Sequence, residues 1–393
     1  MKILVVCQYY YPEPFRITDI CEELVSRGHE VTVVTGVPNY PMGMIYKGYN
    51  RRNRRNEIIN GVRVHRCFTI GRRTGAIWRL FNYYSYATSS SRYTAGLSES
   101  YDIVFVNQLS PIMMANAGIA YKKSHNIKLV LYCLDLWPES LVVNGIQKSS
   151  YLYKLYHLIS ANVYRQADKI LITSSSFAEY FKTEFGICDT DYIPQYAETL
   201  FNAELCIKAP NANIDLMFAG NVGAAQSVDT IIRAANHLRN IDNLHWHIVG
   251  DGSELEHCIE LAESLKIESI KFHGRQPIEK MPEYYAMADA MIITMKQDEF
   301  LSKTLPSKVQ TYMSAGKPII GAVNGETAAV ITAAQCGYCV AAEDYISLSD
   351  SVLNFCYCDN KSSLGKSALQ YYESSFSKEI IMNNLCALLE KYR

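Results

Sequence analysis

Short apolar segments recur along this chain, and each is followed by a polar or Gly-rich turn. In the first half they are Ile3–Cys7, Val31–Thr35, Ile103–Val106, Lys128–Cys133 and Lys169–Thr173. In the second half they are Ile214–Ala219, His247–Val249 and Ile270–Gln276. Short runs without strict polar alternation are typical of strands buried on both faces of a parallel sheet. With a helix expected over Thr18–Arg27, the pattern predicts an α/β fold.

The chain is expected to fold as two domains joined by a linker. A polar, irregular stretch over 193–213 separates a first domain, 1–192, from a second α/β domain, 214–370. The remaining residues, 371–393, include an amphipathic helix. A length of 393 residues with 49% hydrophobic content is sufficient for two ordinary domains.

The segment Leu305–Pro318 reads as a short helix that begins as an anion site. Pro306 suits the first helical position, and Gly316 suits the left-handed residue after the helix end. The first amides, near Ser307, have no intrahelical partner, and Lys308 adds a cation in the first turn. The segment therefore predicts a diphosphate-binding helix start.

Two Gly-rich turns that follow predicted strands are further candidates for anion binding. Gly220 and Asn221 follow the strand that ends at Ala219, and Gly250 follows the strand that ends at Val249. Glycine lets a backbone approach a ligand closely, and the carboxyl ends of parallel strands are where open α/β sheets bind ligands. Each turn alone is a weak signal, but their order strengthens the prediction.

That order resembles family-4 retaining glycosyltransferases. The matching segments are FAGNVG, HIVGDGSELE, FHGRQP, ADAMIIT and LPSKVQTYMSAGKPIIGAVNGETAAVI. The resemblance implies the GT-B architecture, with two facing Rossmann-like domains, an interdomain cleft and a final helix, within 371–393, that crosses back to the first domain. GHEVTVVTGVPNYPMG and YCLDLWPES are similar to the branch that builds lipid-linked capsule and O-antigen saccharides, such as L-fucosamine and colanic acid transferases.

The resemblance implies which residues contact a nucleotide-sugar donor. Those expected at the pyrophosphate are Lys308, Ser307, Gly220 and Asn221, and Gly250 is also expected to bind the donor. Lys308 would also stabilise the charge that grows on the leaving phosphate. Arg275 is in the loop that contacts the base in the family, so it is expected at the base or a phosphate, with a surface salt bridge as the alternative.

The chain departs from the family at two positions where glutamates are usual. Lys303 occupies the first, near the donor sugar, and Thr311 occupies the second, at the ribose. A carboxylate can accept from both ribose hydroxyls, whereas threonine offers one short hydroxyl. The candidate substitutes are Gln310, Glu299 and Glu326.

Candidate acceptor residues lie in the first domain. Asp135 follows an apolar strand and is expected either as a catalytic or acceptor-binding carboxylate or as an N-cap of the next helix. Glu139 follows it, and Asn39 and Tyr40 lie in the PNYPMG segment. No covalent nucleophile is expected, because the family's proposed mechanism lets the departing phosphate assist the incoming hydroxyl.

Neither a metal nor a cofactor is expected, since the nucleotide sugar is a substrate. The first strand lacks a GxGxxG turn, which argues against a nicotinamide dinucleotide. Asp189-Thr190-Asp191 is interpreted as a solvated loop rather than a metal site. The twelve cysteines lack zinc-site spacing and are expected to be reduced.

A basic stretch in the first domain predicts docking on an anionic membrane. Arg51, Arg52, Arg54, Arg55, Arg63, Arg66, Arg72, Arg73 and Arg79 stand against one acid, Glu57, which gives +8 over positions 51–79. Trp78 and Phe81 follow, and aromatics beside arginines are typical of interfacial segments. A solvated basic loop plus a core helix is the alternative. Nucleic acid also attracts basic runs, but it is not the expected partner.

These observations together predict a retaining, metal-independent glycosyltransferase. It would move a hexose or N-acetylhexosamine, such as N-acetyl-fucosamine, from a UDP-sugar to a polyprenyl-diphosphate-linked saccharide. Since no apolar stretch of eighteen residues and no signal peptide are found, the protein is expected in the cytoplasm, peripheral on the inner face of the plasma membrane. The alternatives are a nucleotide-sugar 2-epimerase of the same fold and a noncatalytic nucleotide-sugar-binding protein.

Overall fold

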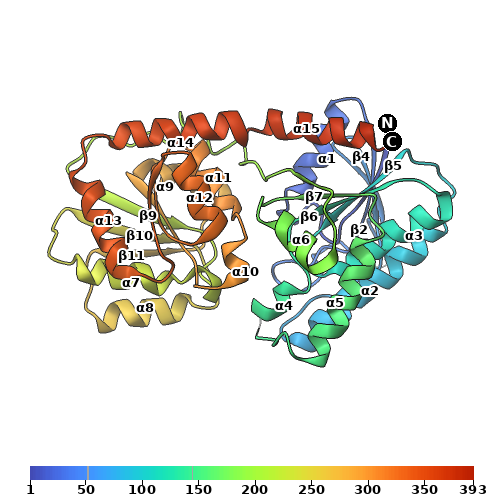
Figure 1. The fold of residues 1–393 in the computed structure, drawn as a ribbon, viewed down its shortest axis with the longest axis horizontal. Helices are drawn as coiled ribbons and strands as arrows, with labels where there is room; N and C mark the ends of the chain where they lie inside the picture. Colours follow the sequence, from blue (N-terminus) through green and yellow to red (C-terminus); the bar gives the residue numbers. More distant parts are fainter. Residues whose placement is uncertain (51–52, 144) are drawn as a thin grey trace. The chain divides into compact units, whose positions relative to one another are not determined.

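The computed structural model describes residues 1–50, 53–143 and 145–393, which form two compact units. The first unit contains Met1–Thr173, Phe177–Ile193 and Met382–Arg393. The second contains Ser174–Ser176 and Pro194–Ile381. Each unit is built on one sheet with helices packed against it (Figure 1).

The sheet of the first unit has eight strands in the order β3-β4-β2-β1-β5-β6-β7-β8. Their bounds are β1 (Lys2–Val6), β2 (Glu30–Thr35), β3 (Asn56–Ile59), β4 (Val62–Arg66), β5 (Ile103–Gln108), β6 (Leu129–Cys133), β7 (Lys169–Ile172) and β8 (Thr190–Tyr192). Neighbouring strands are parallel except for the antiparallel pair β3–β4. The strand order reverses direction beside β1, which places a ligand-binding edge at the carboxyl ends of β1 and its neighbours.

In the described part of this unit, six α-helices and one short 3-10 helix accompany the sheet, apart from the C-terminal segment. They are α1 (Ile17–Ser26), α2 (Ala76–Ala95), η1 (Ile112–Ala115), α3 (Asn116–His125), α4 (Glu139–Val143), α5 (Tyr151–Tyr164) and α6 (Phe177–Phe185). The C-terminal segment joins α1 through Arg27, whose Nη1 donates to Asn383 Oδ1 at 2.6 Å.

The sheet of the second unit is parallel throughout, in the order β11-β10-β9-β12-β13-β14. Its strands are β9 (Ile214–Ala219), β10 (Leu244–Val249), β11 (Ile270–Gly274), β12 (Ala290–Thr294), β13 (Ile319–Ala322) and β14 (Gly337–Val340). The α-helices are α7 (Val228–His237), α8 (Leu255–Ser264), α9 (Met281–Met287), α10 (Glu299–Ser302), α11 (Ser307–Ser314), α12 (Gly325–Ala333), α13 (Tyr345–Tyr357), α14 (Lys361–Ser375) and α15 (Lys378–Lys391), whose last ten residues belong to the first unit.

Alternating side chains of β9 show why the second sheet is apolar on both faces. Leu216 and Phe218 belong to one buried cluster, and Met217 and Ala219 belong to another. Successive strand residues point to opposite faces, so the unbroken apolar run fills two cores. Residues 194–213, which hold no helix or strand, pack on this unit through Phe201 and Cys206.

Two sequence-based expectations are corrected by the strand assignments. Asp189-Thr190-Asp191 is not a solvated loop, because Thr190 begins the edge strand β8 and Lys169 Nζ contacts both carboxylates, that of Asp191 at 2.9 Å. The basic stretch is not a simple loop either, since β3 and β4 form a hairpin within it. Apolar residues at Ile59, Val62 and Val64 supply the strand pattern that the arginines obscured.

Candidate functional site

The two predicted Gly-rich turns meet at the carboxyl ends of β9 and β10. Gly220 and Gly250 have φ values of 145° and 144°, a region that glycine alone adopts readily. A Cβ on Gly250 would lie 1.8 Å from the Gly220 carbonyl oxygen, so the two turns are in backbone contact. Gly220 and Asn221 are exposed, which leaves this edge open to a ligand.

The two turns at Gly220 and Gly250 together form a glycine cradle. Lys308 lies beside this cradle, in the first turn of α11. A Cβ on Gly220 would lie 3.0 Å from the Lys308 Nζ. The Nζ is buried without a hydrogen-bond acceptor among the described residues, and it lies 4.1 Å from the centre of the Phe218 ring. Burial lowers the pKa of Lys308 to about 7. An unpaired ammonium next to a glycine cradle is a site that an anion would complete.

A buried tyrosine holds α11 against the end of β9. The Tyr312 hydroxyl donates to the Ala219 carbonyl at 2.9 Å and accepts from the Ala219 amide at 3.1 Å. No side chain caps the N-terminus of α11, because Pro306 occupies the N-cap position. The first amides of this helix, beginning at exposed Ser307, therefore keep their donor capacity for a ligand.

The residues at the family's two glutamate positions are already engaged. Thr311 is buried and its Oγ1 donates to the Ser307 carbonyl at 3.1 Å. Lys303 Nζ donates to Glu299 Oε1 at 2.7 Å. Neither side chain therefore copies a carboxylate that accepts from hydroxyls.

The three candidate substitutes also have protein partners. Gln310 is buried. With its side-chain amide oriented so that the nitrogen faces hydrogen-bond acceptors, that nitrogen donates to the carbonyls of Pro306 and Ser307. Glu326 accepts from Ser175 and Ser176 within the second unit. Glu299 is exposed and bonded to Lys303. The structure therefore singles out no replacement for the ribose carboxylate.

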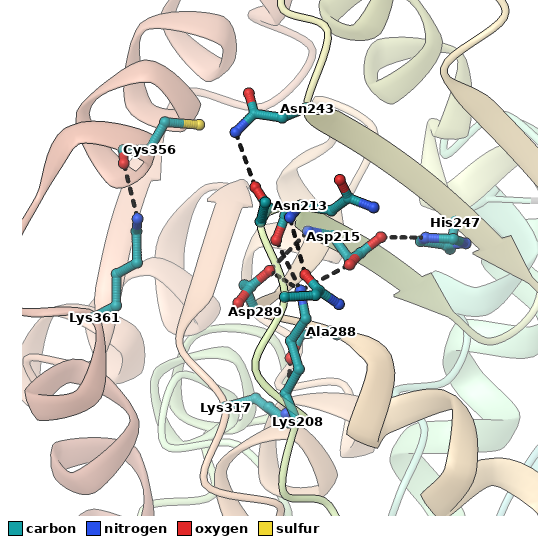
Figure 2. A network of polar contacts seen from close by, with 12 residues as sticks. Lys208, Asn213, Asp215, Asn243, His247, Ala288, Asp289, Lys317, Cys356 and Lys361 are labelled. Carbon is teal, nitrogen blue, oxygen red and sulfur yellow. Dashed lines mark hydrogen bonds and ion pairs between the residues drawn. The ribbon is translucent and has the colours of Figure 1, made fainter.

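A polar network joins β9 and β10 in the second unit (Figure 2). Lys208 Nζ contacts the carboxylates of Asp215 and Asp289, and Asp215 Oδ1 lies 2.9 Å from His247 Nε2. Burial raises the pKa of Asp215, but the Lys208 hydrogen bond and its other partners lower it below the usual value overall.

The network continues to β11, because His247 Nδ1 lies 3.0 Å from His273 Nε2. Burial, followed by the neighbouring His247, lowers the pKa of His273 to about 4, so the His273 imidazole stays neutral at physiological pH. Arg275 follows two residues later and is exposed. It makes no ion pair within the described ranges, so the surface salt bridge considered as its alternative role is not found there.

Asp135 is held by serine hydroxyls in the first unit. Its carboxylate accepts from Ser110 Oγ and, at 2.9 Å, from Ser140 Oγ. Trp137 Nε1 donates to Ser110 Oγ at 2.7 Å, which fixes that serine in turn. Burial raises the pKa of Asp135, and the two serines oppose the shift. The residue as a whole remains partly exposed.

Glu139 connects two helices. One carboxylate oxygen accepts from the Tyr153 hydroxyl at 2.7 Å, and the other lies 3.1 Å from Lys148 Nζ. The side chain is buried. These contacts give Glu139 a role in joining α4 to α5.

Glu13, which the sequence reasoning missed, contacts two of the predicted acceptor residues. It is buried, and it accepts from the amides of Asn39 and Tyr40 at 2.8 and 2.7 Å. Burial raises the pKa of Glu13 to about 7, although these amides oppose the shift. Asn39 Oδ1 in turn accepts from the Arg72 amide at 3.1 Å. A lone acid in the apolar loop YYYPEPF, directly after the first strand, was the available signal.

The basic stretch is only partly available to a surface. Arg51 and Arg52 lie outside the described residues. Arg54 and Arg55 are exposed, whereas Arg66 is buried and pairs with Glu57 at 3.0 Å. Over the ranges that the structure describes, no helix is long and apolar enough to cross a membrane.

Both halves of the chain match known families. Residues 15–193 match the glycosyl transferase 4-like domain, and residues 207–366 match glycosyl transferases group 1. A protein of Escherichia coli K12 assigned to colanic acid biosynthesis as the glycosyl transferase WcaI is 24% identical over 337 residues, which are 80% of this chain and 82% of that protein.

Solved structures share the fold over the whole chain. Sucrose-phosphate synthase from Thermosynechococcus elongatus superposes with a TM-score of 0.78 at 14% identity, covering 99% of this chain and 98% of that one. Anabaena HepE in complex with UDP and glucose has a TM-score of 0.71 at 15% identity, with 99% of each chain covered. WaaG, a glycosyltransferase involved in lipopolysaccharide biosynthesis, has a TM-score of 0.69 at 14% identity, also with 99% of each covered. The chain therefore belongs to the glycosyltransferases of GT-B fold, with a glycosyl transferase 4-like domain followed by a group 1 domain.

Proposed function

We propose that this glycosyltransferase moves a sugar from a UDP-sugar to a polyprenyl-diphosphate-linked saccharide, with retention at the anomeric carbon and without a metal ion. The observation that carries the proposal is the buried Lys308 ammonium, which has no acceptor and lies against the Gly220 cradle. Anabaena HepE, which shares the fold, was solved with UDP-glucose. The relatives WcaI and WaaG support surface polysaccharide synthesis as the process.

The chemistry assigned to these residues is stabilisation of a leaving diphosphate. The bond between the anomeric carbon and the donor phosphate breaks, and a new bond forms to the acceptor hydroxyl oxygen. The hydroxyl proton passes to the departing phosphate. Negative charge grows on that phosphate, where the Lys308 ammonium and the first amides of α11 strengthen their interaction as the bond breaks.

Metal independence is part of the proposal because the DxD carboxylates are engaged elsewhere. Lys169 contacts both Asp189 and Asp191 at an edge strand. In this arrangement the lysine supplies the positive charge that a divalent cation would otherwise bring.

The test is turnover of UDP-linked hexoses and N-acetylhexosamines, including UDP-N-acetyl-fucosamine, with and without a polyprenyl-diphosphate saccharide. UDP release is expected only when the acceptor is present, with retained configuration by NMR and an unchanged rate in EDTA. Epimerised UDP-sugar without acceptor would indicate an epimerase, and tight binding without turnover would indicate a binding protein. A rate that EDTA abolishes and magnesium restores would contradict metal independence.

We also propose that the first unit docks peripherally on the anionic inner face of the plasma membrane, where a polyprenyl acceptor resides. The first turns of α2 expose Ile77, Trp78 and Phe81, so they are not the start of a core helix. Arg73 lies 4.3 Å from the Trp78 ring, measured from its guanidinium carbon. Arginines beside exposed aromatics match an interface of anionic headgroups and acyl chains.

Helix α5 enlarges the apolar surface in a way that the sequence analysis did not anticipate. Tyr151, Leu152, Leu155 and Leu158 are exposed on it. The hydroxyls of Tyr84 on α2 and Tyr156 on α5 lie 3.1 Å apart, which brings the two helices together. Exposed apolar residues gathered on adjacent helices are characteristic of membrane or protein interaction sites.

Liposome co-sedimentation tests this docking. Binding is expected to rise with anionic lipid and fall with salt. Changing Arg51, Arg52, Arg54 and Arg55 to Ser should weaken it at least about tenfold, because each arginine near an anionic leaflet contributes about 1 kcal/mol. Trp78→Ser with Phe81→Ser should weaken it further.

The matched control is Tyr357→Ser, which removes an aromatic side chain that is 80% exposed on α13 of the second unit. This variant should sediment like the parent protein. Equal binding to neutral and anionic vesicles would refute the electrostatic account.

A further inference from the structure

A cavity of about 260 Å³ lies in the first unit, separate from the glycine cradle beside Lys308 in the second unit. Its lining residues are Val37, Asn50, Arg55, Arg66 and Phe68. Arg66 ends β4, Val37 lies two residues after the end of β2, and Phe68 follows β4. The cavity therefore opens at the carboxyl ends of parallel strands, the edge where open α/β sheets bind ligands.

Arg66 is the feature that makes this cavity a candidate site. It is 1% exposed, and its Nε donates to Glu57 at 3.0 Å while its Nη2 donates to the Tyr11 carbonyl at 2.7 Å. Its Nη1 is buried and has no hydrogen-bond acceptor among the described residues, while the guanidinium carbon lies 4.8 Å from the centre of the Tyr49 ring. A buried charged donor without an acceptor is costly, so its presence beside a cavity points to a ligand that accepts from it.

Arg55 adds a second cation to the same cavity. Its Nε donates to the Arg66 carbonyl at 3.4 Å, and the side chain is exposed. Burial, with a smaller contribution from Arg55, lowers the pKa of nearby His65 to about 4. Glu57, the acid closest to Arg66, also lies 4.0 Å from Arg54, so two arginines share it.

The lining selects a small, highly charged anion. No Asp or Glu is among the lining residues that the structure describes, and Val37 and Phe68 supply apolar walls. The volume is below the range of about 300–1,000 Å³ usual for drug-sized ligands. Two guanidinium groups suit phosphate oxygens, which accept paired N–H donors.

We propose that the Arg55–Arg66 cavity binds a phosphate or diphosphate group. Its biological ligand rests on the proposed function: the diphosphate of the polyprenyl-linked acceptor. An anionic phospholipid headgroup or free phosphate presents the same chemistry. Arg66 also holds the Tyr11 carbonyl, in the loop that carries Glu13, so a bound phosphate would order the loop that follows β1.

Hydrogen–deuterium exchange of the full chain with inorganic pyrophosphate tests the cavity without requiring turnover. Pyrophosphate is expected to slow exchange of peptides covering residues 55–68 by at least about threefold. Arg55→Gln should abolish this protection. Arg54→Gln is the matched control, because it removes the same charge one residue away, outside the lining, and should keep the protection.

Peptides covering residues 305–312 provide an internal reference for the separate Lys308 site. Protection there but not over residues 55–68 would overturn the proposal while leaving the proposed transferase function intact. Equal loss in Arg54→Gln and Arg55→Gln would also overturn it, because general electrostatic attraction would then explain the effect.

Three further arms identify the source of the phosphate. Protection by polyprenyl diphosphate in detergent, but not by polyprenyl alcohol, would assign the acceptor diphosphate. Protection by phosphatidylglycerol vesicles beyond that by phosphatidylcholine vesicles would assign a lipid headgroup. Protection by pyrophosphate alone would assign a free-phosphate site.

Discussion

Replacing Lys308 with Ala is expected to lower the turnover number for sugar transfer by about a hundredfold or more. Removing one preorganised donor from developing negative charge costs about 10²–10³ in rate in other enzymes, and Lys308 would supply a full cation. The Lys308 Nζ has no hydrogen-bond acceptor among the described residues. Its N–H donors would therefore all be available to a donor phosphate. The measurement is steady-state UDP release with saturating acceptor.

The fold should survive this change. Because burial lowers the pKa of Lys308 from 10.5 to about 7, its ammonium is less favourable in the folded protein than in the unfolded chain. The buried ammonium destabilises the fold by its full amount below about pH 7, and this destabilisation disappears above about pH 10.5. Lys308→Met, which keeps the apolar stem, should therefore unfold at a higher temperature than the parent at pH 7, by a margin that shrinks toward pH 10.

Lys317→Met is the matched control. Lys317 is another buried lysine of the second unit, and its Nζ donates to the Ala288 carbonyl at 2.7 Å, away from the glycine cradle. Burial also lowers the pKa of Lys317, to about 8, so this variant matches the loss of a buried lysine, and it should retain most of its turnover. Near-normal turnover of Lys308→Ala, or equal losses in the Lys308 and Lys317 variants, would refute the assignment of Lys308.

Binding of UDP should be accompanied by proton uptake above pH 7. With a pKa of about 7, Lys308 is roughly nine-tenths neutral in the free protein at pH 8. A diphosphate beside it favours the ammonium and raises its pKa, so the complex takes up a proton. Affinity for UDP is therefore expected to fall by about tenfold per pH unit above pH 7.5, until the pKa of the complex is reached.

Isothermal titration calorimetry at pH 8 in two buffers of different ionisation enthalpy measures this uptake. The parent protein should take up close to one proton per UDP, and Lys308→Met should take up none. Working above pH 7.5 keeps the UDP phosphates ionised, since a phosphate monoester has a second pKa of about 6. A buffer-independent enthalpy for the parent would contradict the assignment of a neutral Lys308.

Much of the second unit was predictable because local chemistry determines it. Gly316 has the left-handed φ of 65° expected after the helix, and α11 begins at Ser307, one residue after Pro306. β9 has the predicted bounds, Ile214–Ala219. Helix boundaries and buried strands depend on neighbouring residues, so a single sequence carries their signals.

Interactions between residues far apart in the sequence were harder to predict. The DxD segment became the edge strand β8 because β7 offered an open edge and Lys169 offered a cation, neither of which is adjacent in sequence. The hairpin of β3 and β4 was hidden because the arginines before β3, with Arg63 and Arg66 in β4, obscured the alternating apolar residues Val62 and Val64.

Sequence alone was sufficient to predict the two α/β halves, the family and the start of helix α11, because periodicity, turn residues and motif order are local properties. Which charged groups find partners depended on the folded structure. Lys308 and Arg66 each keep a buried nitrogen without a partner, whereas Glu139, Lys303 and Thr311 are engaged by protein groups. Whether a charged group has a partner depends on which residues folding brings within about 3 Å, and sequence spacing does not encode those distances.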